Sequence, residues 1–207
     1  MSRCDSAFLR LACLCLLAML GSGCVLWPRP VVEDANMVAW NARQAVLREL
    51  DEWTLQGRVA SGGVLGFTGR LRWRQSMEQC VVDISGPLGA GATRVTGTSS
   101  RIEIRDAEGA WVTDDPEAAL REAYGWTLPL TGLRQWAVGL PMADVPADLQ
   151  VDASGRLVTL TQAGWTVTYE AYADTGAGVA LPQKIIIDNG ETRWRLLVDR
   201  WTVTALA

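Results

Sequence analysis

The sequence contains no histidine among its 207 residues. Without histidine, the usual catalytic triads, the common zinc ligand sets and a general base that titrates near neutral pH are largely excluded. Phenylalanine and tyrosine are scarce, with 2 and 3 residues, whereas there are 10 tryptophans. The net charge is only −4, and no stretch of the chain forms a basic stripe. A nucleic-acid partner is therefore not expected.

Other motifs typical of enzymes are also missing. Asp114, Asp115 and Glu117 are explained by their position at a helix start, where acidic side chains interact favourably with the helix dipole. The glycine-rich stretch at 86–91 lacks the Lys and the Ser or Thr of a phosphate-binding loop. No nucleophile is accompanied by a plausible base. We therefore expect neither an enzyme nor a cofactor or metal site.

The beginning of the chain has the order of a bacterial lipoprotein signal peptide. Residues 1–10 are basic and contain Arg3 and Arg10. An apolar run follows at 11–20, and the small residues 21–23 lead to Cys24. This run is too short to span a bilayer, which requires about 20 apolar residues. Although Leu20 stands one place earlier than usual, the pattern predicts that residues 1–23 are removed before a lipid-modified Cys24.

The mature chain would contain only two cysteines, Cys24 and Cys80. If Cys24 is lipidated, Cys80 is expected to be a small buried hydrophobe; a disulfide between the two in an oxidising periplasm is the alternative. Val25 stands where an Asp would be the inner-membrane retention signal, so the outer membrane is the expected location. Residues 24–33 are predicted to be the lipidated cysteine and a tether, and residues 34–207 a single domain.

Short strands with period-two alternation account for most of residues 53–203. The clearest strand ranges are 53–60, 66–75, 80–85, 93–98, 101–105, 156–161, 165–169, 184–188 and 193–203. In the second range, Arg70, Arg72 and Arg74 are expected on a solvated face, with one of them at the rim of a pocket as the alternative. Short connections between most of these strands predict an antiparallel meander of about eleven strands, curled into a barrel or a strongly curved sheet.

Three helices are also predicted. Residues 34–50 form an amphipathic pattern. Its apolar side is expected to include Val38, Ala42, Ala45 and Val46, widened by Met37, Trp40 and Leu47. Helices at about 116–124 and 129–140 each begin at a proline and interrupt the meander. They are therefore expected to pack over one end of the barrel as a lid.

The residues Gly86-Pro87-Leu88-Gly89 form a tight turn between two predicted strands. Proline restricts φ and glycine permits positive φ, so the turn is well specified, with Leu88 at its tip. Such tips are normally polar, and the following Ala90-Gly91-Ala92 offers no side chain to cover Leu88. Leu88 is expected either to contact an apolar partner or to fold back onto the rim of the barrel.

Several longer motifs resemble the LolB family of outer-membrane lipoproteins. The most specific are GWTLPL at 125–130 and LRQWAVGLP at 133–141. Further matches follow in order, at Gln56-Gly57-Arg58, Arg72-Trp73-Arg74-Gln75, Gly86-Pro87-Leu88-Gly89, Gly164-Trp165 with Tyr169 and Tyr172, Leu181-Pro182 and Asp199-Arg200-Trp201. As a set, these motifs cover nearly the whole mature domain.

The resemblance implies a mainly β fold with helices, an incomplete, half-open antiparallel barrel with an α-helical lid. It implies a receptor that takes lipoproteins from the periplasmic carrier LolA and holds their acyl chains in an apolar cavity. It also identifies Gly86, Pro87, Leu88 and Gly89 with the loop that passes cargo into the membrane. We expect a monomer on the periplasmic face of the outer membrane, at its inner leaflet, anchored by the lipid on Cys24.

The candidates for the cavity wall are large apolar residues of the barrel and of the lid. They are Trp53, Phe67, Leu71, Trp73, Ile84, Leu130, Leu133, Trp136 and Leu140. Each of them fits a filled core equally well, because a lined cavity and a filled core produce the same sequence pattern. A structural or scaffolding lipoprotein with a filled barrel and no ligand is therefore the alternative.

Overall fold

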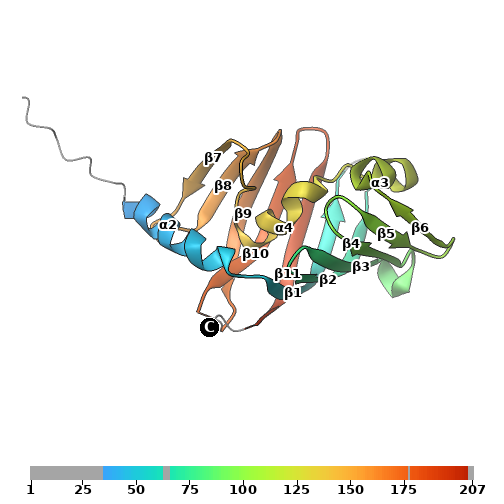
Figure 1. The fold of residues 1–207 in the computed structure, drawn as a ribbon, viewed down its shortest axis with the longest axis horizontal. Helices are drawn as coiled ribbons and strands as arrows, with labels where there is room; N and C mark the ends of the chain where they lie inside the picture. The colour runs from blue at the N-terminus through green and yellow to red at the C-terminus, as the bar shows by residue number, and fades with distance from the viewer. Residues whose placement is uncertain (1–34, 63–65, 177, 205–207) are drawn as a thin grey trace, which may run out of the picture. The chain divides into compact units, whose positions relative to one another are not determined.

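The computed structural model describes residues 35–62, 66–176 and 178–204. The predicted signal peptide, Cys24 and the tether lie outside the described residues. One antiparallel sheet runs in the order β6-β5-β4-β3-β2-β1-β11-β10-β9-β8-β7, and β6 and β7 are its two open edges within the described part (Figure 1). The prediction of an incomplete antiparallel barrel of about eleven strands with three helices is confirmed.

The strands follow the expected ranges closely. They are β1 (Glu52–Ser61), β2 (Thr68–Ser76), β3 (Gln79–Ser85), β4 (Thr93–Gly97), β5 (Ile102–Arg105), β6 (Ala110–Thr113), β7 (Ala147–Val151), β8 (Leu157–Gln162), β9 (Trp165–Asp174), β10 (Ala180–Asp188) and β11 (Arg193–Val203). No range was predicted for β6 or β7. Both are short edge strands, and all of their residues are exposed or only half-buried, so the alternation is weak.

The helices are α2 (Ala35–Arg48), α3 (Pro116–Tyr124) and α4 (Leu130–Val138). In Figure 1, α4 lies across the middle of the sheet and α2 lies toward the β7 edge. We call the sheet face beneath these helices the inner face and the opposite one the outer face. The Asp115 side chain caps α3 by accepting a hydrogen bond from the Ala118 amide at 3.1 Å. The left-handed Gly125 ends the same helix.

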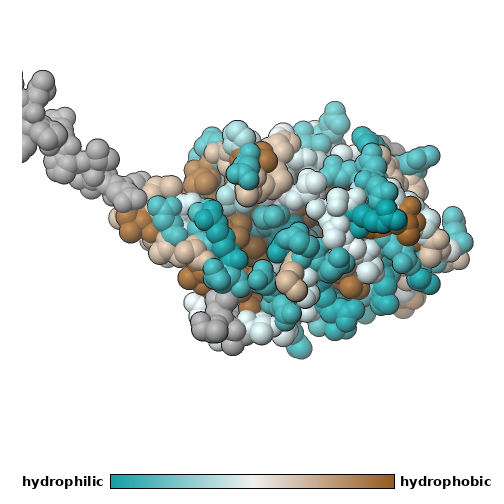
Figure 2. Space-filling model, viewed as in Figure 1, coloured by the Kyte–Doolittle hydropathy of each residue, from teal (hydrophilic) through white to brown (hydrophobic). Residues whose placement is uncertain are grey.

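The inner side of α2 differs from the expected one. Trp40 and Leu47 are buried, whereas Val38 is 50% exposed and Val46 is 40% exposed. Trp40 and Leu47 are two helical turns apart and carry the largest apolar surfaces, so burying them turns the valines outward. Hydrophobic residues are accordingly visible on the surface around α2 in Figure 2.

The ring N–H groups of four tryptophans all have hydrogen-bond partners. Trp73 donates to Gln75 Oε1 at 3.0 Å, and Trp136 donates to Gln162 Oε1 at 3.1 Å. Trp194 and Trp201 donate to backbone carbonyl oxygens, each at 2.9 Å. Because each indole is both large and satisfied, tryptophan can fill this core without leaving a buried polar group unpaired.

The strands β1 and β11 join the two halves of the sheet. Arg58 lies opposite Leu197, and Gln56 lies opposite Arg200, with a β-bulge between these pairs. A Cβ atom at Gly57 would lie 2.3 Å from the carbonyl oxygen of Leu197, so the two backbones approach too closely there for any side chain. This pairing places residues from the beginning and the end of the domain side by side.

Candidate functional site

A cavity of about 120 Å³ lies between the inner face of β2–β5 and the segment that contains α3 and α4. Most of its wall is apolar. The wall consists of Trp73, Gln75, Glu78, Cys80, Val82, Ile84, Val95, Thr98, Ser99, Ile102, Leu120, Trp126, Leu128, Leu130, Thr131, Leu133, Arg134 and Gln135. The arrangement suits an apolar ligand, because uncharged side chains from both the sheet and the helices face the same space.

Four of the predicted wall residues line this cavity: Trp73, Ile84, Leu130 and Leu133. The other five lie elsewhere. Trp53, Leu71, Trp136 and Leu140 are buried in the main core, and Phe67 is half-buried against it. Of these, Trp53 and Leu140 border a second hollow between α4 and the end of α2. The difference depends on where each residue lies: the apolar cavity is left beneath α3 and the start of α4, whereas Leu71 and Trp136 are enclosed by other side chains of the main core.

Six apolar wall residues were not identified from the sequence. They are Val82, Val95, Ile102, Leu120, Trp126 and Leu128. The alternation in strands 93–98 and 101–105 contained the signal for Val95 and Ile102. On β3, Val82 stands at period two between the wall residues Cys80 and Ile84. The sequence pattern does not distinguish side chains that face a cavity from side chains that fill a core.

Trp126, in the connection between α3 and α4, holds the lid against the sheet. Its ring lies 5.1 Å from the ring of Phe67, 5.0 Å from that of Tyr124 and 5.9 Å from that of Trp194, measured between centroids. Contacts of this kind add modestly to the energy of apolar burial. The lid is therefore fixed at its middle by aromatic packing.

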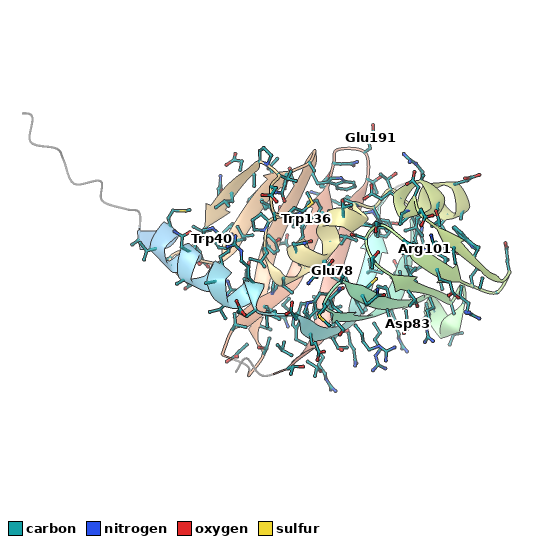
Figure 3. The ribbon with its side chains drawn as sticks, in the orientation of Figure 1. Trp40, Glu78, Asp83, Arg101, Trp136 and Glu191 are labelled. Carbon is teal, nitrogen blue, oxygen red and sulfur yellow. The ribbon has the colours of Figure 1, made fainter. Side chains whose placement is uncertain are left out.

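Polar groups stand at one edge of the cavity. Arg134 on α4 forms an ion pair with Glu78, in the turn between β2 and β3, and its guanidinium lies 3.9 Å from Asp51. In Figure 3, Glu78 lies below α4. The neighbouring Gln135 has a buried Oε1 atom without a hydrogen-bond partner among the described residues. Arg134 and Gln135 also line a second hollow of about 290 Å³ between α4 and the end of α2.

The half-buried thiol of Cys80 forms part of the cavity wall. Burial raises its pKa above the ordinary thiol value, so at neutral pH the group remains protonated and weakly polar. The predicted alternative of a disulfide with Cys24 is not tested, because Cys24 lies outside the described residues.

The turn that carries Leu88 is closed by backbone hydrogen bonds. Gly86 N–H donates to the Ala90 carbonyl at 2.8 Å, Gly89 N–H to the Gly86 carbonyl at 3.1 Å, and Ala90 N–H to the Pro87 carbonyl at 3.1 Å. Leu88 adopts φ 56° and ψ 20°, a left-handed conformation that is unfavourable for a bulky side chain. Its relative exposure is 109%, so it touches neither the rim nor the core. The turn therefore holds a strained, fully exposed leucine in place.

Within the described ranges, no helix is both long and apolar enough to cross a membrane. No group of three or more Cys, Asp or Glu side chains in this part of the chain could hold a metal ion. The exposed Leu88 and the apolar cavity are thus the two features that call for a functional explanation.

Comparisons with known proteins match the chain to one family. The family model for the outer membrane lipoprotein LolB matches residues 51–201. A LolB from Nitrosococcus oceani is 33% identical over 195 residues, covering 93% of this chain and 96% of the relative. A LolB from Xanthomonas euvesicatoria is 38% identical over 200 residues, covering 93% of this chain and 91% of the relative.

Solved structures with little sequence similarity share the fold. A LolA superfamily protein from Nitrosomonas europaea superposes with a TM-score of 0.50 at 10% identity, covering 80% of this chain and 94% of that one. A DUF1329 family protein from Desulfovibrio piger superposes with a TM-score of 0.53 at 8% identity, covering 84% of this chain and 96% of that one. At these identities the likeness concerns the arrangement of the sheet and helices alone.

Proposed function

The chain belongs to the LolB family of outer-membrane lipoproteins, and from this premise we propose that it receives lipoproteins from the periplasmic carrier LolA. The family membership places it in lipoprotein localisation at the outer membrane. In this proposal it acts as a monomer without cofactor, catalyses no reaction and is anchored to the periplasmic face by a lipid on Cys24. It holds the acyl chains of the cargo in its cavity and then inserts them into the inner leaflet.

The apolar cavity beneath α3 and α4 is the observation that carries the proposal. Each CH₂ group of an acyl chain costs about 0.8 kcal/mol in water, so the carrier and the receptor must both keep the chains covered. A receptor whose apolar site binds the chains more strongly than the carrier receives them without an external energy source. The cavity wall supplies the apolar contacts for such a transfer.

The cavity must widen to accept cargo. One water-sized group needs about 10–15 Å³, so a cavity of about 120 Å³ has room for fewer groups than one long acyl chain contains. Gly125 and Gly139, both at positive φ, end α3 and α4 and can serve as hinges. Opening would separate Arg134 from Glu78, an ion pair exposed enough to break at low cost.

Gln135 supplies a polar contact for the cargo. Its buried Oε1 atom lacks a hydrogen-bond donor among the described residues, which is costly in the free protein. An acylated N-terminal cysteine carries an amide N–H beside its acyl chain. In the proposed complex this N–H donates to Gln135 Oε1, so the site distinguishes an N-acylated protein from a simple hydrocarbon.

A transfer assay tests the proposal. Residues 25–207, which contain every described strand and helix, are made without lipid and mixed with carrier that holds a triacylated lipoprotein. The two proteins are then separated, and the cargo is located. We expect the cargo on this protein. If it stays on the carrier although this protein is folded, either the receptor role is wrong or reception requires the lipid on Cys24, and lipidated protein in the same assay separates these outcomes.

Two neighbouring valines provide a matched pair of variants. Val82 lines the cavity, whereas Val81, on the same strand, belongs to the outer face opposite Arg74. Val82→Trp should fill the cavity and leave the cargo on the carrier, and Val81→Trp should receive cargo normally. Equal reception by the two variants would show that the acyl chains bind elsewhere.

A scaffolding lipoprotein without ligand remains the second candidate, because the larger part of the core is filled. An apolar fluorescent dye distinguishes the two functions. A receptor binds the dye in one-to-one proportion, and Val82→Trp prevents this binding. A scaffold binds no dye in either form.

A further inference from the structure

The outer face of the sheet carries a group of arginines on β2 and β11. Arg70, Arg72 and Arg74 alternate along β2, and Arg195 and Arg200 stand on β11. All five are exposed. We refer to these five residues as the outer arginines. They gather in a chain whose net charge is −4, so the positive charge belongs to this surface and not to the protein as a whole.

The outer arginines form no ion pair within the described residues. The two acidic groups nearest to them are engaged by other arginines. Asp199 pairs with Arg58 at 2.8 Å, and Asp83, which lies opposite Arg72 in the β2–β3 ladder, pairs with Arg94 at 2.5 Å. Asp83 lies at the lower right of Figure 3. Arg58 also stands directly opposite Arg70 in the β1–β2 ladder. Like charges in this position destabilise a sheet, so stability does not explain the cluster.

The strand register places part of this cluster at the base of the Leu88 turn. Arg70 pairs with Ser85, the last residue of β3 before the turn. Arg195 pairs with Ala60, which in turn pairs with Thr68, so Arg195 lies on β11 at a level beyond Arg70 toward the turn. Arg72 and Arg200 both pair with Gln56 and stand one row farther away.

We propose that the outer arginines bind the headgroups of anionic phospholipids while Leu88 enters the bilayer. This inference rests on the proposed delivery of cargo at a membrane surface, and it names the lipid class that the delivery end of the receptor recognises. Arginine suits this partner because its planar guanidinium donates two parallel hydrogen bonds to a phosphate.

Leu88 and the arginines at the base of its turn can contact a bilayer in one orientation. The three residues from Gly86 to Leu88 extend at most about 10 Å beyond Ser85. The headgroup layer on each side of the hydrocarbon core is about 5–8 Å thick. With Leu88 at the hydrocarbon boundary, the base of the turn is therefore at most about 10 Å away, so the long side chains of Arg70 and Arg195 can reach the lipid phosphates.

A lipid surface fits these residues better than an acidic protein does. The cluster is continuous with the one fully exposed leucine among the described residues, and together they pair an apolar tip with a cationic base. That combination is characteristic of surfaces bound to membrane interfaces, where apolar insertion and attraction to anionic lipids add. Each arginine near an anionic surface is expected to increase partitioning about fivefold.

Vesicle binding tests the proposal without cargo or carrier. Residues 25–207 without lipid are mixed with vesicles of phosphatidylethanolamine and phosphatidylcholine, and with vesicles in which a quarter of the lipid is phosphatidylglycerol. We expect at least about tenfold stronger partitioning onto the anionic vesicles, which high salt abolishes. Arg70→Gln/Arg195→Gln should remove this gain, about 10- to 30-fold, and leave binding to neutral vesicles unchanged.

Arg48→Gln/Arg121→Gln is the control, because it removes two exposed arginines from α2 and α3 that also lack an ion pair in the described part. It should bind anionic vesicles nearly as well as the unaltered protein. An equal loss in both double variants, or equal binding to the two kinds of vesicle, would overturn the proposal. If Arg70→Gln/Arg195→Gln instead loses only cargo transfer from the carrier, the partner is an acidic protein surface and the proposal is wrong, although the receptor function stands.

Discussion

Gln162 Oε1 on β8 accepts a hydrogen bond of 3.1 Å from Trp136 Nε1 on α4. The same oxygen accepts from the Met142 amide at 2.8 Å, and Gln162 Nε2 donates to the carbonyls of Met142 at 3.1 Å and Val145 at 2.8 Å. Gln162 is only 2% exposed, so one buried side chain fixes the end of the lid to the sheet. This arrangement separates the fixed end of α4 from the end that borders the cavity.

Gln162→Leu should therefore destabilise the protein strongly. The indole N–H of Trp136 and the amide of Met142 would be buried without an acceptor, and we expect the free energy of unfolding to fall by about 2–4 kcal/mol. Urea unfolding measures this change. Gln150→Leu, on the exposed edge strand β7, is the control and should stay within about 0.5 kcal/mol. Similar losses in both variants would show that the buried network does not hold α4.

Leu88→Gly should separate stability from delivery. Glycine accepts φ 56° without strain, so the free energy of unfolding should be unchanged or higher by up to about 1 kcal/mol. Delivery of cargo into vesicles should nevertheless drop, as it should in Leu88→Glu, while uptake from the carrier continues.

Met77 offers a matched control for Leu88. It is also an exposed apolar residue at positive φ, with φ 48° and 63% exposure, but it lies at the opposite end of β3. Met77→Gly should change stability by a similar amount and deliver cargo normally. Normal delivery by Leu88→Gly would remove Leu88 from the mechanism.

Gln135→Leu should weaken cargo binding without weakening the fold. Because it removes a buried acceptor that has no donor among the described residues, the free energy of unfolding should be unchanged or rise by up to about 1 kcal/mol. Binding of an N-acylated peptide should become about five- to tenfold weaker, whereas binding of an apolar dye without an amide should be unchanged. Competition between peptide and dye gives both affinities, and equal losses for the two ligands would contradict the role of the amide.

The tyrosines should ionise only at high pH in the folded protein. Desolvation and the hydrogen bond to Asp106 raise the pKa of Tyr124 to about 12, and burial raises the pKa values of Tyr169 and Tyr172. All three folded-state values exceed the unfolded value of about 10. The resulting stabilisation is complete below pH of about 10 and is lost as the pH rises toward the folded-state values.

Absorbance of tyrosinate measures this difference directly. The native protein should show little tyrosinate until the pH exceeds about 11, whereas protein in urea should ionise near pH 10. Tyr124→Phe should remove the first part of the native transition. Ionisation of the native protein near pH 10 would mean that these hydroxyl groups are not desolvated.

Local signals in the sequence were sufficient for most individual elements. The carboxylate of Asp115 and the positive φ of Gly125 delimit α3 by interactions within a few residues, and the turn at Leu88 depends on its own Pro and Gly. The inner side of α2 could not be obtained in this way. Trp40 packs against the turn at Gly155, where an added Cβ would lie 2.4 Å from the Trp40 nitrogen, and that contact joins residues more than a hundred positions apart.

The sequence alone determined the meander of strands, the starts of the helices and the tight turn at Leu88, because each of these depends on neighbouring residues. Only the tertiary structure decided that Trp73 borders a cavity while Trp136, with the same apolar pattern, is fully enclosed in the core. It also decided that Arg70 and Arg195 lie on one face, although the sequence has no basic stripe, since the pairing of β1 with β11 brings the two ends of the domain together. Cavities and surface charge both depend on contacts between distant segments, and no local pattern encodes them.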